Sequence, residues 1–514
     1  MQGTYYLGVD IGTTSTKAVL FSQSGKVVSS HYCEYPLLTP TPLIAEQDPN
    51  LIFNAVIKAI KAAICKSAVK KEQLAFISFS SAMHSVMAVN KDGQPLTNSI
   101  TWADSRSAPW SEKIKTEMNG HDIYRRTGTP IHPMSPLSKI TWLRYEQPDI
   151  FECTYKFISI KEFVFYKLFN KFVVDYSIAS ATGMFNLNSL DWDDEALRIA
   201  GITKKQLSDI VSTTYSLTGM KREYANYMDF LSTTPFIIGA SDGVLSNVGM
   251  NAIDKGVVAM TIGTSGAIRA VVDEPITDPE GRFFCYALTD KHWVIGGPVN
   301  NGGIILRWVR EQFANAEVEK AVCSTNQDPY DVLSDLALQI APGSDGLLFL
   351  PYLSGERAPL WDANARGTFF GLGLHHNKEH MIRAVFEGVV LNLYHVRNTL
   401  QAYIGTPTKL LATGGFARSK LWRQMVADIF NQEVQVPESF ESSCLGAVIL
   451  GMYAVGDIPS LKEASAFIGT TNSHIPIDEH VKVYQELIPI YINVSAQLQD
   501  QYEQIASFQQ KWIQ

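Results

Sequence analysis

Near the start of the chain, in "YLGVDIGTTSTKAVLF", an aspartate stands between an apolar stretch and a turn of small residues. Backbone N–H groups approach a phosphate closely only where the neighbouring side chains are small. The turn meets this requirement and its hydroxyl groups add donors; its residues are Gly12, Thr13, Thr14 and Ser15. We interpret it as a candidate phosphate site, which leaves the acidic Asp10 beside it to be explained.

Asp10 and a bound phosphate would repel each other unless a cation lay between them. Magnesium binds carboxylate oxygens directly or through water, so Asp10 is the candidate anchor for Mg²⁺. Lys17 lies on the next expected strand, but the direction of its side chain depends on the hairpin register, and its role is left open. The alternative is an ordinary hairpin turn in which Asp10 only caps or turns the chain.

A similar pattern returns in "GVVAMTIGTSGAIRAVV", residues 256–272. When the two Ile-Gly-Thr stretches are aligned, Thr261 takes the place of Asp10, so the second copy lacks the charge. A second candidate phosphate turn then consists of Gly263, Thr264 and Ser265. The repeat indicates a duplicated fold whose two turns hold the same phosphates from two sides.

A second carboxylate, Asp242, directly follows an apolar run in "IIGASDGVLSN". A general base must lie within reach of the hydroxyl proton that it removes, and a strand end facing a cleft is a suitable place. By local pattern alone Asp242 reads as a turn residue, but its position between the two phosphate turns favours the catalytic role. We place a domain boundary near residue 245, where the repeat restarts, giving domains 1–245 and 246–514.

Two further segments combine an aromatic residue with polar side chains, as carbohydrate sites require for C–H surfaces and hydroxyl groups. Their residues are Met83, His84 and Ser85 in one segment and Trp102, Asp104 and Arg106 in the other. Arg106 or His84 could also meet an anionic substrate. The alternative is that Trp102 belongs to the core and that Asp104 and Arg106 form a surface ion pair.

The elements that carry these residues alternate between strands and helices. Apolar residues flank both turns, which predicts two β-hairpins. Apolar residues at helical spacing follow in residues 48–68, and the strand-like "LAFISFSSAMHSVMAV" comes next. In "LLATGGFARSKLWRQMVADIF" a strand, a glycine turn and a helix follow one another, a place suited to the polar end of a ligand. The expected fold class is α/β.

Length and composition limit the remaining classes of function. A chain of 514 residues exceeds a single core, so at least two domains are expected. The net charge of -8 offers no general basic field for nucleic acid or an anionic membrane. The six cysteines have no paired spacing, and neither a signal peptide nor about 18 uninterrupted apolar residues can be found. We expect a cytoplasmic protein without nucleic-acid or membrane partners.

With "LGVDIGTTSTK", "GASDG", "TIGTSG" and "TGGFARSKLWRQMVAD" in this order, the chain resembles the FGGY carbohydrate kinases. "MSPLSKITWL" and "GTFFGLGLHHNKEHMIRAVFEG" agree with that family as well. The resemblance, which covers about residues 5–455, implies two duplicated ribonuclease H-like domains of the actin and sugar-kinase superfamily, flanking an interdomain cleft. It also implies ATP and Mg²⁺ as cofactors.

The resemblance further implies a role for each candidate residue. Asp242 becomes the catalytic base, Asp10 lies near magnesium, and the two turns hold the phosphates of ATP. Gly303 and Arg307 fall where related kinases contact the nucleotide, and Gly415 and Ser419 fall where they contact its adenosine part. Arg307 and Ser419 depart from relatives such as glycerol kinase, which carry amide side chains there.

Within the family, "SSAMHS" and "PLTNSITWADSRS" are most similar to the gluconate kinases. Xylulose kinases tend to carry Met-His-Gly and Trp-Asn-Asp-Gly-Arg segments, from which Ser85 and Ala103 depart. The expected reaction is ATP-dependent phosphorylation of D-gluconate, with xylulose or another sugar or polyol as alternatives. A sugar-independent ATPase of the same fold and a non-catalytic carbohydrate-binding protein are the rivals from other classes. A homodimer is kept open as the assembly.

Overall fold

The chain divides into two compact units, each assembled from separate segments. This computed structural model describes residues 3–229, 231–325, 327–437 and 441–512. Unit 1 comprises residues 1–254, 271–295 and 441–469, and unit 2 comprises residues 255–270, 296–440 and 470–514. The predicted domains, 1–245 and 246–514, are each a continuous segment, whereas these units are not. The division at residue 245 and the interdomain cleft stay predictions.

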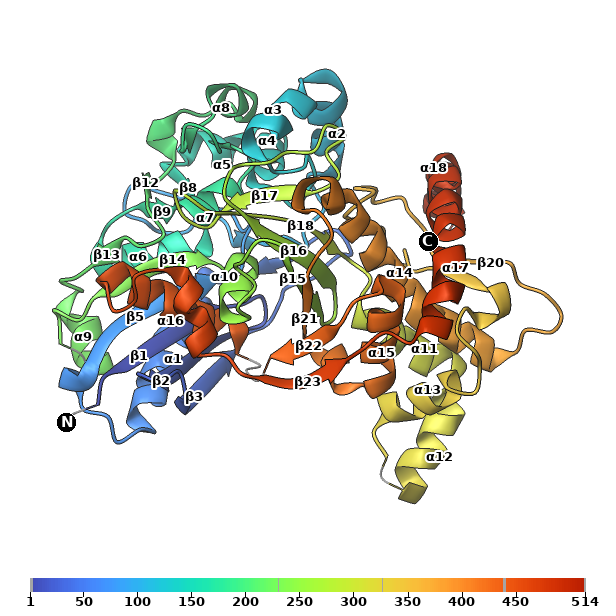
Figure 1. Cartoon of the computed structure of the whole chain (residues 1–514). Helices are drawn as coiled ribbons and strands as arrows, with labels where there is room; N and C mark the ends of the chain where they lie inside the picture. Colours follow the sequence, from blue (N-terminus) through green and yellow to red (C-terminus); the bar gives the residue numbers. More distant parts are fainter. Residues whose placement is uncertain (1–2, 230, 326, 438–440, 513–514) are drawn as a thin grey trace. The chain divides into compact units, whose positions relative to one another are not determined.

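Unit 1 is built on a six-stranded sheet with the order β13-β14-β5-β1-β2-β3 (Figure 1). Strands β1, β5 and β14 run parallel to one another, whereas β2 is antiparallel to both β1 and β3. The strands are β1 Tyr5–Ile11, β2 Ser15–Ser22, β3 Val27–Glu34, β5 Leu74–Ser81, β13 Ser216–Leu217 and β14 Phe236–Ser241. The predicted first hairpin is therefore confirmed as the β1–β2 pair.

Both faces of this sheet are covered, which explains why β1 is apolar at nearly every position. Alternate residues of a strand point to opposite faces. Leu7 and Val9 face α1 (Pro49–Cys65), where they share a buried cluster with Val56 and Ile60. Asp48 caps α1 by accepting a hydrogen bond of 2.8 Å from the N–H of Asn50, and Pro49 occupies the first turn.

On the opposite face two helices approach the sheet and each other unusually closely. They are α10 (Asp242–Gly249) and α16 (Ser442–Val455), and α16 packs on β1 and β5 although it comes more than 350 residues later in the chain (Figure 1). A Cβ added at Gly446 would lie 2.0 Å from the carbonyl oxygen of Leu245, and one at Gly249 would lie 1.8 Å from that of Ser442. Only glycine fits at these crossings, and α10 begins with Asp242.

The remaining elements of unit 1 surround this sheet. The helices are α2 Ala108–Glu117, α3 Gly120–Thr127, α4 Pro136–Glu146, α5 Pro148–Cys153, α6 Ile160–Phe169, α7 Tyr176–Ser180, α8 Asp194–Ala200 and α9 Arg222–Met228. Two short strands, β4 (Glu46–Gln47) and β7 (Ser99–Ile100), pair antiparallel to each other. They support the loops that carry Trp102 and Arg106.

Unit 2 repeats the strand pattern of unit 1. Its strands follow the order β16-β15-β21-β22-β23 within a seven-stranded sheet, with β15 antiparallel to β16 and parallel to β21, and β21 parallel to β22. These relations reproduce β2-β1-β5-β14 position for position. The strands are β15 Val257–Ile262, β16 Gly266–Val272, β21 Lys409–Thr413, β22 Val434–Pro437 and β23 Thr470–His474. The predicted α/β class and the duplicated sheet are thus confirmed.

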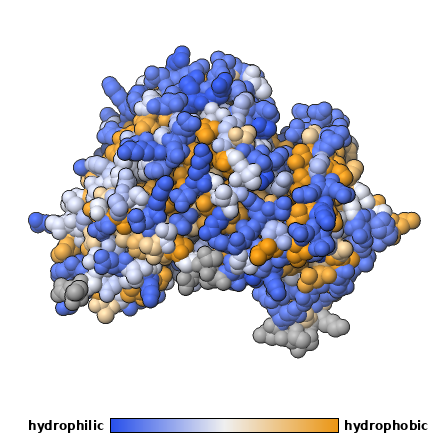
Figure 2. All heavy atoms as spheres, viewed as in Figure 1, coloured by the Kyte–Doolittle hydropathy of each residue, from blue (hydrophilic) through white to orange (hydrophobic). Residues whose placement is uncertain are grey.

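Some helices of unit 2, such as α14 (Lys378–Ile404), are largely buried, whereas others expose apolar side chains to solvent. The other α-helices of unit 2 are α11 Gly303–Phe313, α12 Asn315–Thr325, α13 Pro329–Ala337, α15 Lys420–Phe430, α17 Asp478–Gln497 and α18 Gln499–Trp512. Large apolar side chains remain exposed on α17 and α18, including Ile490, Phe508 and Trp512. Figure 2 shows hydrophobic atoms scattered among hydrophilic ones over the visible face. Among the described helices, none combines the length and the hydropathy needed to cross a bilayer.

Gly446→Ala should destabilise the protein because its new Cβ would overlap the backbone of α10. We expect a loss of about 1 to 3 kcal/mol, the scale of an overpacked core, measured as a shift of the urea unfolding midpoint. Gly415→Ala is the matched control, because a Cβ there meets no atom within 4 Å, and it should shift stability by less than about 1 kcal/mol. An unchanged midpoint for Gly446→Ala would contradict the packing argument.

Candidate active site

Two carboxylates lie at the same edge of the unit 1 sheet. Asp10 of β1 is paired in register with Ser80 of β5, and Ser81 is paired with Ser241 at the end of β14. Asp242 follows Ser241 directly as the first residue of α10. Because the carboxyl ends of parallel strands meet at one edge of a sheet, where α/β folds bind their ligands, the topology brings Asp10 and Asp242 together.

The surroundings of Asp10 confirm this proximity. Its pKa is raised to about 6, first by burial and then by the negative charge of Asp242, while a hydrogen bond from Ser80 opposes the shift. The Ser80 hydroxyl donates to Oδ1 of Asp10 at 2.7 Å. Two repelling carboxylates with a hydroxyl nearby form an oxygen-donor set that fits a hard divalent cation.

That cation would need ligands beyond the protein. Within the part of the chain that the structure describes, no group of three or more His, Cys, Asp or Glu residues could hold a metal ion. Magnesium commonly binds through one or two carboxylates and completes its shell with water and substrate phosphates. The residues present at Asp10 fit that mode of binding.

Asp242 is held by the strand that precedes it. Its Oδ1 accepts a hydrogen bond of 2.7 Å from the N–H of Gly243. Beneath it, the buried Nζ of Lys161 contacts Asp175 at 2.6 Å and donates to the carbonyls of Ile238 and Ala240 at 3.2 and 3.1 Å. Burial lowers the pKa of Lys161, while Asp175 is the largest of the charges that oppose this shift. Lys161 therefore fixes the end of β14 from which Asp242 projects.

The turn predicted to bind phosphate, Gly12 to Ser15, closes the hairpin between β1 and β2. The N–H of Gly12 donates to the carbonyl of Ser15 at 3.0 Å. The indole N–H of Trp102 donates to the hydroxyl of Thr13 at 3.0 Å. The structure thus brings a residue of the predicted substrate loops into direct contact with the predicted phosphate turn.

Lys17, whose role the sequence leaves open, is paired with a carboxylate. It lies opposite Asp10 in the β1–β2 register. Its Nζ donates to both carboxylate oxygens of Glu441, at 2.9 and 2.8 Å. Burial lowers the pKa of Lys17, but the hydrogen bond and charge of Glu441 outweigh it and leave the pKa raised. The charge of Lys17 is therefore balanced by the residue that precedes α16.

His84 stands in the loop after β5 with its ring anchored on both sides. Its backbone is left-handed, with φ of 66°, an uncommon conformation for a residue with a side chain. Nδ1 lies 2.7 Å from the carbonyl of Ala181, which can only accept, so Nδ1 carries the proton. Nε2 then accepts from the hydroxyl of Tyr286 at 3.3 Å. The imidazole supports the loop, and its predicted contact with substrate stays a prediction.

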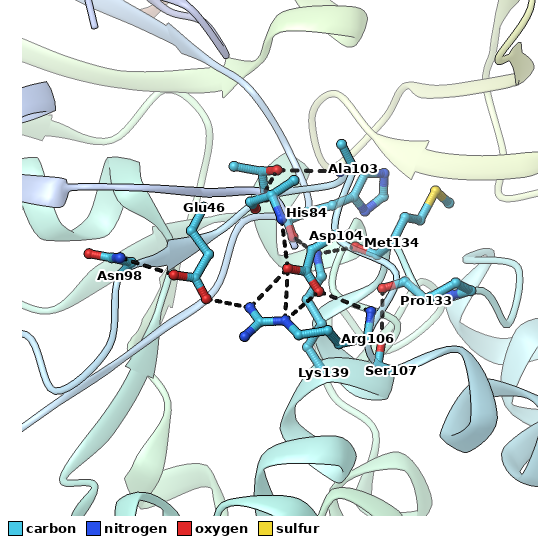
Figure 3. Close-up of polar contacts among 12 residues, drawn as sticks. Glu46, His84, Asn98, Ala103, Asp104, Arg106, Ser107, Pro133, Met134 and Lys139 are labelled. Atoms are coloured by element: carbon cyan, nitrogen blue, oxygen red, sulfur yellow. Dashed lines mark hydrogen bonds and ion pairs between the residues drawn. The ribbon is translucent and has the colours of Figure 1, made fainter. Parts of the chain in front are cut away.

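A fully buried lysine, Lys139 of α4, holds the same loop from below. Its Nζ donates to the carbonyls of His84 at 2.8 Å and Met134 at 2.7 Å, as Figure 3 shows. Burial lowers the pKa of Lys139 to about 7, with Asp104 opposing the shift and Arg106 adding to it. This lysine connects the His84 loop to the segment "MSPLSKITWL".

Arg106 belongs to a compact ion-pair network (Figure 3). Its Nε lies 3.1 and 3.0 Å from the two oxygens of Asp104, and its Nη2 is paired with Glu46. The guanidinium also lies over the ring of Trp142, 4.7 Å from its centroid. Asp104 is buried and accepts a further bond from the N–H of Ala45. Asp104 and Arg106 are therefore not an ordinary exposed pair.

The other two residues predicted for the substrate loops have different settings. Met83 is half-buried and packs against the core under α10 and α16. Ser85 is buried, and its hydroxyl accepts a hydrogen bond of 3.2 Å from the N–H of Ile160 at the start of α6. Within the loop, Ser85 thus holds the neighbouring helix.

In unit 2 the second turn predicted to bind phosphate is one residue shorter than the first. Three residues separate the paired Ile262 and Gly266, whereas four separate Ile11 and Thr16. The N–H of Gly263 donates to Ser265 at 2.8 Å, and the N–H of Gly303 donates to the carbonyl of Gly263 at 2.7 Å. The start of α11 therefore packs on this turn, and a Cβ at Gly303 would lie 2.7 Å from the same carbonyl.

The remaining nucleotide residues predicted for unit 2 occupy separate places. Arg307 is exposed and pairs with Glu311 at 2.9 Å. The hydroxyl of Ser419 caps α15 by accepting from Trp422, and it lies 3.3 Å from the hydroxyl of Ser334. Gly415 follows β21, with open space where a Cβ would stand. Their contacts with a nucleotide stay predictions.

Two family profiles together match most of the chain, up to residue 455. The N-terminal domain of the FGGY family of carbohydrate kinases matches residues 5–249, and its C-terminal domain matches residues 258–455. The chain belongs to the FGGY family. The gluconokinases of Bacillus subtilis (strain 168) and Bacillus licheniformis are 59% and 58% identical to it, covering 99% and 98% of both chains respectively.

Solved FGGY structures share the fold. A gluconate kinase and a ligand-bound xylulose kinase, both from Lactobacillus acidophilus, each match with a TM-score of 0.92 and 40% identity. Each match covers 98% of this chain and all of the solved chain. The xylulose kinase of Bacillus subtilis (strain 168) is 27% identical over 98% of this chain.

Sequence reasoning missed most of the residues that hold this FGGY site in place. Ser80 lies in a segment interpreted only as a strand, and Glu46 and Glu441 carried no local signal. Lys139 offered only a weak one, because it stands between the apolar Leu137 and Ile140 in a helix that also carries polar residues. Its partners are backbone carbonyls, which no side-chain pattern reveals.

Lys139→Met should make stability less dependent on pH. Between the folded pKa of about 7 and the ordinary value of 10.5, the unfolded chain binds more protons than the folded one, so stability rises with pH, by up to about 1.4 kcal/mol per pH unit. Methionine has no such proton. We therefore compare the melting temperatures of both proteins at pH 7, 8 and 9. The melting temperature of the unmodified protein should rise relative to that of Lys139→Met as the pH increases.

Lys115→Met, which removes an exposed ammonium group, is the matched control and should track the unmodified protein at each pH. The same pH response in Lys139→Met and the unmodified protein would contradict the burial argument.

Proposed function

We propose that this chain transfers the γ-phosphoryl group of ATP to D-gluconate, giving 6-phospho-D-gluconate and ADP. As a member of the FGGY family it is a carbohydrate kinase, and ATP is the phosphate donor. The observation that carries the choice of gluconate is the near-complete match with two gluconokinases. The departures at Ser85 and Ala103 from xylulose kinase segments point the same way.

Asp242 is the proposed general base. It takes the proton from the primary hydroxyl of the substrate as that oxygen attacks the γ-phosphorus in line. Its place at the end of β14, fixed by Lys161 beneath and α16 beside it, supports this role because a base must be held where the hydroxyl arrives. The Gly12–Ser15 turn of unit 1 is proposed to bind phosphate oxygens.

Unit 2 is proposed to contribute the Gly263–Ser265 turn and Gly303 to the phosphates, and Gly415 to the adenosine part. Arg307 and Ser419 complete the proposed nucleotide contacts. Magnesium is proposed at Asp10, supported by its repulsion from Asp242 and by the Ser80 hydroxyl. When bound, it would neutralise charge on the transferred phosphoryl group.

The substrate loops are proposed to bind the sugar acid through Trp102, Arg106 and neighbouring side chains. The guanidinium of Arg106 is already paired with Asp104 and Glu46. A carboxylate of the substrate would therefore share the N–H donors of Arg106 with these two side chains. Xylulose is the second candidate, favoured by the equal similarity of the chain to the solved xylulose kinase. A cytoplasmic location and a homodimer belong to the same proposal.

A substrate panel with coupled ADP release tests the choice of sugar. Gluconate should give a kcat/KM at least about tenfold above those of xylulose, ribulose, fuculose and glycerol, the scale of one lost substrate contact. ATP hydrolysis without any sugar should be slow. A preference for xylulose would replace gluconate as substrate, and full-rate hydrolysis without sugar would contradict the kinase proposal.

Asp242→Asn should keep ATP binding and lose at least about 100-fold in kcat, the usual contribution of a general base. The substitution removes the proton acceptor and changes the side-chain shape little. Asp92→Asn, in an exposed turn, is the matched control and should retain full turnover. Near-normal turnover of Asp242→Asn would remove Asp242 from the role of base.

A further inference from the structure

Two side chains hold successive carbonyls of the first phosphate turn. The hydroxyl of Tyr35, just after β3, donates to the carbonyl of Gly12 at 2.6 Å. The side-chain amide of Gln47, on β4, donates to the carbonyl of Thr13. Neither side chain was predicted to belong to the site, and neither lies next to the turn in sequence.

Holding a carbonyl also fixes the N–H on the other side of its peptide bond. In a trans peptide the C=O of one residue and the N–H of the next point in opposite directions. The turn contains no cis bond. Because Tyr35 holds the Gly12 carbonyl, the N–H of Thr13 points away from Tyr35. In the same way, the N–H of Thr14 points away from Gln47, which holds the Thr13 carbonyl.

The two N–H groups so directed are donors with no protein acceptor. Among the described residues, neither the Thr13 nor the Thr14 N–H makes a hydrogen bond within the chain. Neither residue is buried: Thr13 is half-buried and Thr14 is exposed. Adjacent backbone donors aimed in one sense form an anion-binding concavity.

The two anchors are themselves well fixed. Tyr35 is 7% exposed and Gln47 is 4% exposed. The Thr16 hydroxyl lies 3.3 Å from that of Tyr35 and can donate to it, which leaves the phenolic proton for Gly12. Burial raises the pKa of Tyr35, so the hydroxyl stays a donor across the working pH range. Gln47 is held in the β4–β7 pair.

We propose that Tyr35 and Gln47 are positioning residues, which set the direction of the Thr13 and Thr14 N–H groups and so create the phosphate-binding surface of the first turn. The inference rests on the proposed use of this turn for ATP. Tyr35 and Gln47, which lie outside the turn, thus set its orientation. The glycine and small residues of the turn only allow its backbone to approach a phosphate closely.

Tyr35→Phe tests the proposal with the loss of one oxygen atom. Without the anchor the Gly12 peptide can rotate, so we expect the Kd for Mg-ATP, measured by calorimetry, to rise about five- to tenfold, the effect of one lost hydrogen bond. The Kd for AMP, which lacks the outer phosphates, and the KM for gluconate should change less than about twofold. Tyr32→Phe, on β3 and 60% exposed, is the matched control and should change none of them.

Gln47→Leu provides a second, independent variant, with the exposed Gln94→Leu as its control. It should raise the Kd for Mg-ATP by a similar factor while leaving that for AMP unchanged. Its melting temperature separates this effect from damage to the fold, since a folded variant with weakened Mg-ATP binding alone supports the proposal.

Unchanged Mg-ATP affinity in folded Tyr35→Phe and Gln47→Leu would overturn the inference, as would equal losses for Mg-ATP, AMP and gluconate. Failure of the proposed function gives a different result. If the unmodified protein ignores gluconate but Tyr35→Phe still weakens Mg-ATP selectively, the sugar assignment fails and the role of the anchors stands.

Discussion

Asp10 and Asp242 place two negative charges at one edge of a parallel sheet, and much of unit 1 is arranged around that constraint. Strands β1, β5 and β14 set the spacing, Ser80 stabilises one carboxylate, and Lys161 lies buried near the other. The negative charge of Asp242, together with burial, raises the pKa of Asp10.

The duplicated strand order places different residues at the same sheet edge in the two units. In unit 1, β5 ends in the His84 loop, braced by Lys139; in unit 2, the corresponding β21 ends in Gly414 and Gly415. Thr261 stands where unit 1 has Asp10, so the second turn carries no charge of its own. At this edge of the sheet, unit 1 therefore presents polar side chains such as Asp10, whereas unit 2 presents glycine backbone at Gly414 and Gly415.

The sequence allowed the hairpins, the α/β class and the duplication to be predicted, because these depend on local periodicity and on glycine turns. The proximity of Asp10 and Asp242 was not predicted, because it depends on the register of β1, β5 and β14, which only the folded chain reveals. The side chains that hold the site residues in place could not be predicted from the sequence. Tyr35, Gln47 and Lys139 act on backbone carbonyls, and a carbonyl is present at every residue, so only the folded chain reveals which one each side chain reaches.

The glycine crossings of α10 and α16 also impose an order on biosynthesis. The residues of α16 come after two of the three segments of unit 2, residues 255–270 and 296–440, have been translated. Until then, Tyr6, Phe21 and Phe76 have no cover from Leu445 and Val448, their partners in the finished core. A nascent chain on the ribosome therefore exposes one apolar face of its first sheet through most of its synthesis, the period when such surfaces need protection from aggregation.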